Sequence, residues 1–352
     1  MAIVFMTLPV YSQTINIPDT EFLHALIEEG VDTNGDGQIT HAEAEGVISL
    51  DISGDNEAWG NISDLKGIKH FTNLETLICS FNRLKSLDVS NNTALIFLMC
   101  HGNKLTSLNV SSNTALEKLN CGELDKGIFG LDKGNCYGNQ LTSLDLSNNT
   151  ALKDLTCDCN QLTSLDVSHN TALDWLSCER NRFTSLDVSH NTALEDLNCG
   201  NNQLTSLDVS NNTALRWLGC GENLLTSLDV SNNIGLVGVI CGDNQLGSLD
   251  VSGCTALEWL ECGENLLSSL DVSTNTALKL LACGNNKLSN LDISKNINLF
   301  SDMVLFDGHL DLSNMRTLYK VCVWEMPFPP TARNHVDTEG SPNVIFTTDC
   351  RQ

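Results

Sequence analysis

The stretch LTSLDVSNNTALRWLGCGENL, from Leu204 to Leu224, decides the fold because the chain repeats it with small changes. Near-copies begin at Leu141, Leu162 and Leu225, in the same 21-residue frame. A repeat period of about 20 to 50 residues is typical of solenoids and of other proteins built from stacked units. The sequence therefore predicts one elongated repeat solenoid in which each unit forms one coil, rather than two or three separate globular domains.

A cysteine recurs at one place in the unit and marks the period. Ten copies of L-x-x-L-x-C-x-x-N-x-L-x-x-L-D-V-S-x-N-T-A run from Leu74 to Asn298, and successive cysteines are 21 residues apart except for a step of 15 from Cys121 to Cys136. Ten of the fifteen cysteines are expected to form a ladder, with one of Cys121 and Cys136 among them. A disulfide between those two, which would close the intervening segment, is left open.

The alternation of residues within the unit assigns its faces. Leu-x-x-Leu-x-Cys is typical of a strand, so Leu218 and Cys220 should point inward while Trp217, Gly219 and Gly221 point outward. Each coil buries its leucines only when a neighbour stacks on it, which makes stability cooperative along the axis. We expect a mostly β structure with short turns and with strands about 4.8 Å apart.

The polar positions of the unit are explained by its turns. The asparagine after each strand is expected to satisfy backbone groups at the bend, and the aspartate of L-D-V-S to accept hydrogen bonds from its own turn. The ladder thiols should be small apolar core groups that stay protonated, because side-by-side thiols cannot surround a tetrahedral zinc ion. Cys322 and Cys350 are our hypothesis for a disulfide in an exported protein.

The composition restricts the partners. A net charge of −25 excludes nucleic acid and anionic membranes as expected ligands and favours cations or a basic partner, although it equally fits plain solubility. No apolar run is long enough to span a membrane. The apolar stretch at residues 2–10, followed by Val10 and Ser12, fits the end of a secretory signal peptide, although the usual basic region before it is missing. The protein is expected to be secreted or cell-surface, and monomeric.

The N-terminal region contains a calcium-loop pattern. Residues 32–43, DTNGDGQITHAE, follow D-x-N-x-D-G-x-I-x-x-x-E, the spacing of an EF-hand loop. The pattern assigns oxygen ligands and predicts one calcium ion as the cofactor, after a helix that Asp19 caps. The predicted ligands are Asp32, Asn34, Asp36, Gln38, Thr40 and Glu43.

Together these features divide the chain into segments. We expect a signal peptide at 1–12, a small helical N-terminal cap at 13–47, a degenerate first coil at 48–73, ten repeats at 74–298 with an insert at 122–136, and a β C-terminal cap at 299–352. Two strands joined by a proline-containing loop are expected in the C-terminal cap. The insert repeats LDKG and is interpreted either as a working loop or as a neutral duplication.

The ten copies resemble the 21-residue leucine-rich repeats of bacteria known as the IRREKO type and, more distantly, the internalins. The resemblance covers Leu74 to Asn298 strongly and the flanks less so. It implies a leucine-rich repeat solenoid in which the cysteine stands where other repeats have an inward leucine. By analogy with the fold, it also implies a recognition scaffold without catalysis.

One outward row suggests where a ligand binds. Three of the five tryptophans stand at the start of alternate strands, with acidic residues or glycine between them. They are interpreted either as binding anchors for a protein or glycan, or as rings that only cover the sheet. A carbohydrate-binding or carbohydrate-processing protein and a structural calcium-stabilised adhesin are the alternative functions, although no acid–base pair or nucleophile motif indicates an enzyme. The predicted ligand-binding face consists of Phe97, Asp154, Asp174, Trp175, Asp196, Trp217 and Trp259.

Overall fold

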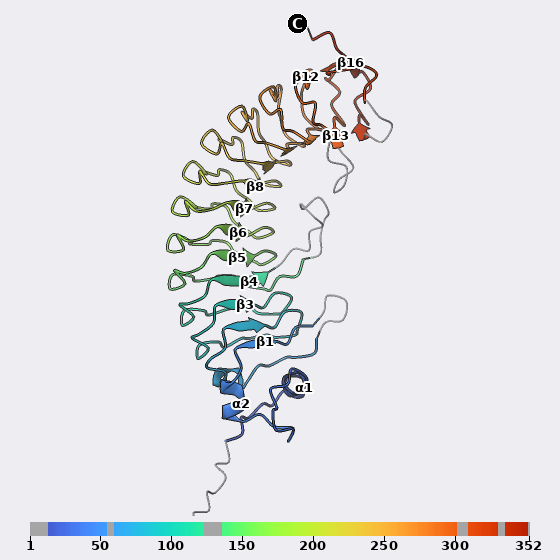
Figure 1. The fold of residues 1–352 in the computed structure, drawn as a ribbon. Helices are drawn as coiled ribbons and strands as arrows, with labels where there is room; N and C mark the ends of the chain where they lie inside the picture. The colour runs from blue at the N-terminus through green and yellow to red at the C-terminus, as the bar shows by residue number, and fades with distance from the viewer. Residues whose placement is uncertain (1–12, 55–59, 123–135, 301–308, 330–334, 351–352) are drawn as a thin grey trace, which may run out of the picture.

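The computed structural model describes residues 13–54, 60–122, 136–300, 309–329 and 335–350. Its coils stack into a bowed solenoid, with the short helices at the N-terminal end and the C-terminus at the other (Figure 1). The prediction of a mostly β leucine-rich repeat solenoid is confirmed. The predicted signal peptide and nearly all of the insert lie outside the described residues.

One parallel sheet of thirteen strands runs the length of the solenoid. Neighbouring strands pair residue for residue at the same repeat position, so Leu218 lies between Leu197 and Val239. The register shifts once, between Asn120 and Gly122, immediately before the insert. In order, the strands are β1 (Ser49–Asp51), β2 (Thr76–Ile78), β3 (Phe97–Met99), β4 (Lys118–Gly122), β5 (Asp154–Cys157), β6 (Trp175–Ser177), β7 (Asp196–Asn198), β8 (Trp217–Gly219), β9 (Gly238–Ile240), β10 (Trp259–Glu261), β11 (Leu280–Ala282), β13 (His309–Asp311) and β15 (His335–Asp337).

The C-terminal segment contains the two expected strands, in residues 317–330 and 343–350, and adds further strands that were not expected. The sheet continues past Asn298, because β13 pairs with β11 and β15 pairs with β13. The coils there are longer than 21 residues, so they do not follow the regular period of the sequence. Leu310 still points inward and is fully buried, as the equivalent leucines are in the regular coils. A second sheet of three parallel strands forms beside them from β12 (Asn290–Asp292), β14 (Lys320–Cys322) and β16 (Ile345–Thr347).

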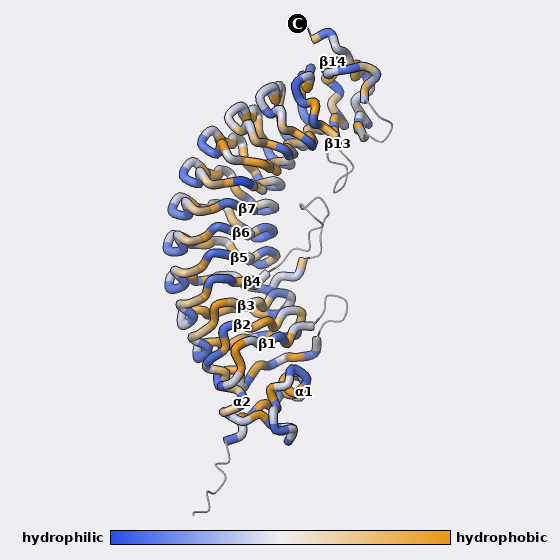
Figure 2. Tube along the Cα trace, viewed as in Figure 1, coloured by the Kyte–Doolittle hydropathy of each residue, from blue (hydrophilic) through white to orange (hydrophobic). Residues whose placement is uncertain are grey.

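The core is a continuous stack of leucines, valines and cysteines. Leu218 and Cys220 are buried as predicted, and the same positions are buried in the other coils. Figure 2 shows hydrophobic residues within the coils and hydrophilic residues at the turns along their outer edge. Ten cysteines form the ladder, and Cys121 rather than Cys136 is the member at the insert. Burial raises the pKa of the Cys220 thiol to about 12, so the ladder is protonated at neutral pH.

Two columns of asparagine hold successive coils together. In the first, Asn223 Nδ2 donates to the carbonyl oxygens of Cys199 and Cys220 at 3.1 Å, while its Oδ1 accepts the Leu204 amide at 2.9 Å. In the second, Asn233 Nδ2 donates to carbonyls of the preceding coil. The predicted role of the first column at the strand ends is therefore confirmed, and both columns bond along the axis.

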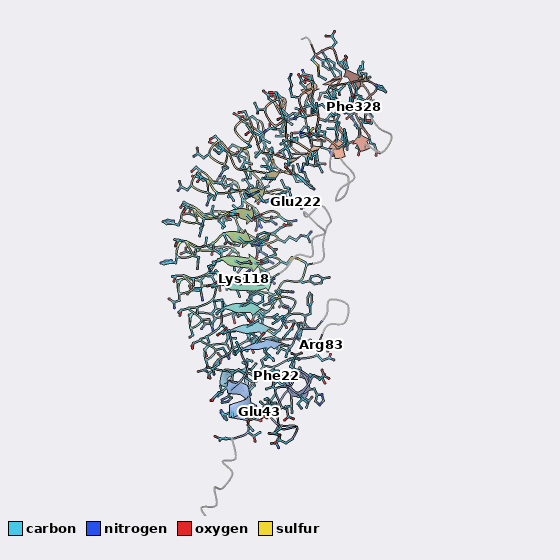
Figure 3. All side chains as sticks on the ribbon, in the orientation of Figure 1. Phe22, Glu43, Arg83, Lys118, Glu222 and Phe328 are labelled. Carbon is cyan, nitrogen blue, oxygen red and sulfur yellow. A yellow bond between two sulfur atoms is a disulfide. The ribbon has the colours of Figure 1, made fainter. Side chains whose placement is uncertain are left out.

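The N-terminal cap packs on the first coil through its helices. Helix α1 (Thr20–Glu28) buries Phe22, which Figure 3 labels, and helix α2 (His41–Glu45) follows the predicted calcium loop. A 3-10 turn, η1 (Ile68–His70), closes the first coil. Asp19 caps α1 as predicted, and its second carboxylate oxygen accepts hydrogen bonds from Ser63, which joins cap to solenoid. None of the described helices has the length and apolar character needed to cross a membrane.

Two disulfides lie outside the ladder. One joins Cys322 to Cys350, the pair named from the sequence, with the two Cα atoms 5.5 Å apart. The other joins Cys136 to Cys159 across 5.6 Å between Cα atoms. The sequence left open a pairing of Cys136 with Cys121. In the structure Cys121 is a buried, free member of the ladder, and Cys136 pairs instead with Cys159.

Candidate ligand-binding face and calcium loop

The outward side of the thirteen-stranded sheet, which we call the strand face, carries a groove of about 600 Å³ lined by residues of strands β4 to β10 and the turns after them. Six carboxylates line it, and none of its lining residues is a lysine, arginine or histidine. Two of the predicted tryptophans, Trp175 and Trp217, stand in its wall with Asp196 between them. The carboxylates are those of Asp158, Glu179, Asp196, Glu222, Asp243 and Glu261; Figure 3 labels Glu222.

The three tryptophans differ in exposure, and the prediction was wrong for one of them. Trp175 is 46% exposed and Trp217 is half-buried, whereas Trp259 is only 5% exposed. The Trp217 ring occupies the space above Gly238, where a Cβ would overlap it, and meets Trp259 edge-on at 6.5 Å between ring centroids. Because Gly238 has no side chain to separate the two rings, Trp259 is packed against its neighbours and is not a surface anchor.

The remaining predicted face residues do not line the groove. Phe97 is half-buried on β3, at the N-terminal side of the groove. Asp154 forms a salt bridge of 3.4 Å with Lys118 of the neighbouring strand, and Asp174 is exposed beside the row. The structure therefore gathers Trp175, Asp196 and Trp217 from the predicted set and leaves the other four outside.

Sequence reasoning missed three of the acidic residues that the structure adds. Asp158 is buried and accepts hydrogen bonds from Ser177 Oγ at 2.7 and 2.9 Å. Glu179 accepts one from Asn198 Nδ2 at 2.8 Å, and Glu261 occupies the last strand position of β10. All three occupy outward positions near the strand ends, where the residue type changes from coil to coil. Comparing these positions across all the coils would have identified them from the sequence.

Two groove carboxylates have raised pKa values. Burial, together with repulsion from Glu195 and Asp174, raises the pKa of Asp196 to about 6, although Arg216 offsets part of that rise. Burial also raises the pKa of Glu261, and repulsion from Asp243 and other carboxylates adds to it. A carboxylate with a raised pKa is one whose surroundings stabilise its charge poorly. The negative charge of Asp196 and Glu261 is therefore only partly compensated by their surroundings.

The predicted calcium loop is a closed network of hydrogen bonds. Asp32 accepts the amides of Gly35 and Gly37, and Glu43 accepts bonds from Thr33 and Thr40. Slight burial opposes ionisation of Glu43, but the bonds from Thr40 and Thr33 outweigh it and lower its pKa to about 2.

These oxygen donors are of the type that calcium prefers, and the ionised carboxylates suit it. The carboxylates of Asp32, Asp36 and Glu43 do not meet within 4.8 Å as a set; among the described residues only Asp292, Cys322 and Cys350 do so, and that pair of sulfurs forms a disulfide. Of the other predicted ligands, Asn34 Oδ1 accepts the Asp36 amide at 2.9 Å, whereas Gln38 is exposed and Thr40 caps α2.

Comparison with solved structures identifies the family. The functional domain of InlJ from Listeria monocytogenes, which includes a cysteine ladder, is 31% identical to the chain and superposes with a TM-score of 0.74. The match covers 96% of this chain and 73% of that one. The chain belongs to the internalin-type leucine-rich repeat proteins. Its own ladder of ten buried cysteines occurs in the same kind of solenoid as the ladder in InlJ.

Two further solved structures share the internalin-type fold at lower identity. Internalin InlF from Listeria monocytogenes is 22% identical with a TM-score of 0.63, and the match covers 97% of this chain and all of that one. The Leptospira interrogans leucine-rich repeat protein LIC12759 is 23% identical with a TM-score of 0.65, over 80% and 75% of the two chains. Protein-family models and curated proteins gave no match.

Proposed function

We propose that the chain is a non-catalytic, secreted or cell-surface scaffold that recognises a protein ligand on its strand face. The observation that carries the proposal is the groove, in which an exposed tryptophan and six carboxylates stand together without a basic residue in the lining. Asp196 and Glu261 gain little from their own surroundings, because burial and neighbouring carboxylates oppose their charge. A complementary ligand gains affinity and orientation from such carboxylates. Membership of the internalin-type proteins supports recognition rather than catalysis.

A protein ligand is favoured over a glycan by the state of the tryptophans. A glycan stacking along the row needs several exposed ring faces at regular intervals. Only Trp175 offers one, because Trp217 lies on Gly238 and Trp259 is buried. The third function, a structural adhesin, predicts that the protein associates with itself, which sedimentation velocity detects directly.

The test is binding to an array of purified extracellular proteins, with glycans as a parallel set. We expect saturable binding to a protein, and we expect Trp175→Ala to weaken it by about tenfold or more, as for an aromatic anchor. Tyr319→Ala is the matched control, because Tyr319 is a comparably exposed aromatic residue, at 54%, outside the groove. Saturable binding only to glycans, or equal losses in both variants, would contradict the proposal.

Export is supported by the two disulfides. Cys136–Cys159 and Cys322–Cys350 require an oxidising environment to form and persist. The ladder thiols tolerate such an environment because burial keeps them protonated and inaccessible.

We further propose that the loop at residues 32–43 binds one structural calcium ion. It lies between α1 and α2, so an ion there would fix the cap against the first coil and stabilise the folded state by mass action. Calorimetric titration with calcium should show one site, and chelation should lower the melting temperature. Asp32→Asn with Glu43→Gln should remove both effects, while Asp51→Asn, an exposed aspartate of β1, should retain them. No heat of binding at millimolar calcium would exclude the site.

A further inference from the structure

The strand face contains two acidic residues of the same row in opposite situations. Asp154 on β5 is paired with Lys118 at 3.4 Å. Asp196 on β7 lies between Trp175 and Trp217 in register, and no described residue donates a hydrogen bond to its carboxylate or places a cation within 4.0 Å of it. The repeat thus pairs one aspartate directly and leaves the other, flanked by two indole rings, with only the charge of Arg216 beyond 4.0 Å to offset its own.

A second carboxylate without a partner stands three strands further along. Glu261 on β10 lines the same groove, and its Oε2 atom is fully buried with no hydrogen-bond donor among the described residues. Leaving a buried charged oxygen unsatisfied is unfavourable, so such a group is usually paired. Neither Glu261 nor Asp196 is explained by the fold, because other coils carry neutral residues at the same two positions, such as Gly238 and Ala282.

One edge of the groove is lined by glycine, at the repeat position two residues after that of Glu261. Gly200, Gly221 and Gly242 occupy the same position in successive coils and line the groove. Stacking alone does not require glycine there, because the equivalent position carries Asp158 and Glu179 in earlier coils. This edge of the groove therefore carries no side chains, and of the three glycines Gly221 is half-buried while Gly200 and Gly242 are buried.

We infer that the groove binds an extended basic polypeptide, with one lysine or arginine side chain between Trp175 and Trp217 against Asp196 and a second against Glu261. This inference rests on the proposed function and adds the chemical class of the ligand. An aromatic wall beside a carboxylate suits a cationic side chain, since indole faces attract cations and the carboxylate supplies the counter-charge. Six lining carboxylates without a basic residue exclude an acidic ligand at the same place.

The spacing of the two subsites sets the spacing of the basic residues. Three strand separations and the offset along the strands place Asp196 and Glu261 about 15 Å apart. An extended polypeptide advances about 3.3 Å per residue and its side chains alternate between two faces, so two cationic residues on the same face are four positions apart.

The test uses fluorescein-labelled threonine-rich peptides on the full-length protein, with binding read by fluorescence polarisation. One peptide carries two lysines four positions apart, one carries a single lysine, and one carries glutamine at both places. We expect the two-lysine peptide to bind about tenfold or more tightly than the glutamine peptide at low ionic strength, with the single-lysine peptide between them.

Variants assign the binding to the two carboxylates. Asp196→Asn should reduce affinity for both lysine peptides, whereas Glu261→Gln should reduce it only for the two-lysine peptide. Asp208→Asn is the matched control, because it removes the same charge from a turn where Asp208 accepts the Ser210 amide. In the equivalent turn of an earlier coil, Asn109 Oδ1 accepts the Ser111 amide in the same way, so asparagine is tolerated there. Melting curves establish that each variant is folded.

The outcomes separate the inference from the proposed function. Equal binding of the lysine and glutamine peptides, no binding of any peptide, or equal losses in Asp196→Asn and Asp208→Asn would overturn the inference. If Trp175→Ala still weakens capture of a protein on the array by about tenfold or more, the proposed function stands without the cationic ligand. If Trp175→Ala has no effect there either, both fail.

Discussion

The column of asparagines contains one cysteine, and replacing it tests what the column contributes. Nine asparagines in the described coils each direct Nδ2 at carbonyl oxygens of the preceding coil; Asn275, for example, donates to Val251 at 2.9 Å and to Cys254 at 2.8 Å. At Cys254 the sulfur lies 3.9 Å from the Val230 carbonyl and 3.6 Å from the Asn233 carbonyl, and a thiol has a single weak donor for both. Cys254→Asn should therefore stabilise the protein.

The magnitude follows from the bonds gained. Two buried amide–carbonyl hydrogen bonds contribute about 1 kcal/mol each. The new Oδ1 atom would be buried without a donor, as it is throughout this column, and that cost offsets part of the gain. We expect a net increase of about 1 kcal/mol in the free energy of unfolding.

Urea unfolding followed by tryptophan fluorescence measures the change as a shift in midpoint at constant slope. Asn233→Cys is the matched reverse variant in the adjacent coil and should lose a similar amount or more, because it removes bonds to Val209 and Asn212. A Cys254→Asn protein no more stable than the parent would refute the idea that these amides tie the coils together.

Three further outcomes follow. Alkylation of the unfolded, unreduced protein should modify eleven cysteines and leave four in disulfides, as intact mass would report. Cys220→Ser should lower the free energy of unfolding by about 1 to 3 kcal/mol, because it buries a hydroxyl in an apolar layer; denaturant unfolding measures this, and an unchanged midpoint would contradict it. Asp196→Asn should raise stability at pH 7.5 but not at pH 3.5. The pKa of Asp196 in the folded protein, about 6, exceeds the usual aspartate pKa of 3.8, so this carboxyl favours folding below pH 4 and that contribution is lost as the pH rises through 6. The shift sets an upper limit of about 3 kcal/mol, and screening at this half-buried site reduces the expected gain to about 1 kcal/mol; equal melting-temperature shifts at both pH values would contradict it.

The fold was predictable because its determinants are local and repeated. Because Leu218 and Cys220 point inward in one coil, the equivalent residues point inward in every coil that keeps the 21-residue period. The two later coils of β13 and β15 escaped prediction because their length breaks the period, although a single inward leucine, Leu310, still places β13 in the stack. The Cys136–Cys159 disulfide was not predicted, because it depends on where the chain rejoins the solenoid after the insert. The repeat period carries no information about that position.

The site was less predictable because the outward residues interact across coils. The three tryptophans occupy equivalent positions in the repeat, but their surroundings differ. Because Gly238 has no side chain, the Trp217 ring packs over it and contacts Trp259, which is buried. Glu261 lies in a different row from Asp196, and only the stacked structure brings both to one groove.

The contrast between the two faces of the sheet bears on function. Inside, each coil repeats the same leucines and cysteines, and the asparagines satisfy the backbone at every turn, so local preference and packing agree. Outside, Asp196 and Glu261 sit where burial and neighbouring carboxylates oppose their charge. A departure from local consistency, in a chain otherwise so regular, is expected where function requires it. Asp196→Asn is expected both to raise stability and to weaken binding of the lysine peptides. Both effects have one cause, a carboxylate whose charge the solenoid compensates poorly and which a basic ligand would neutralise.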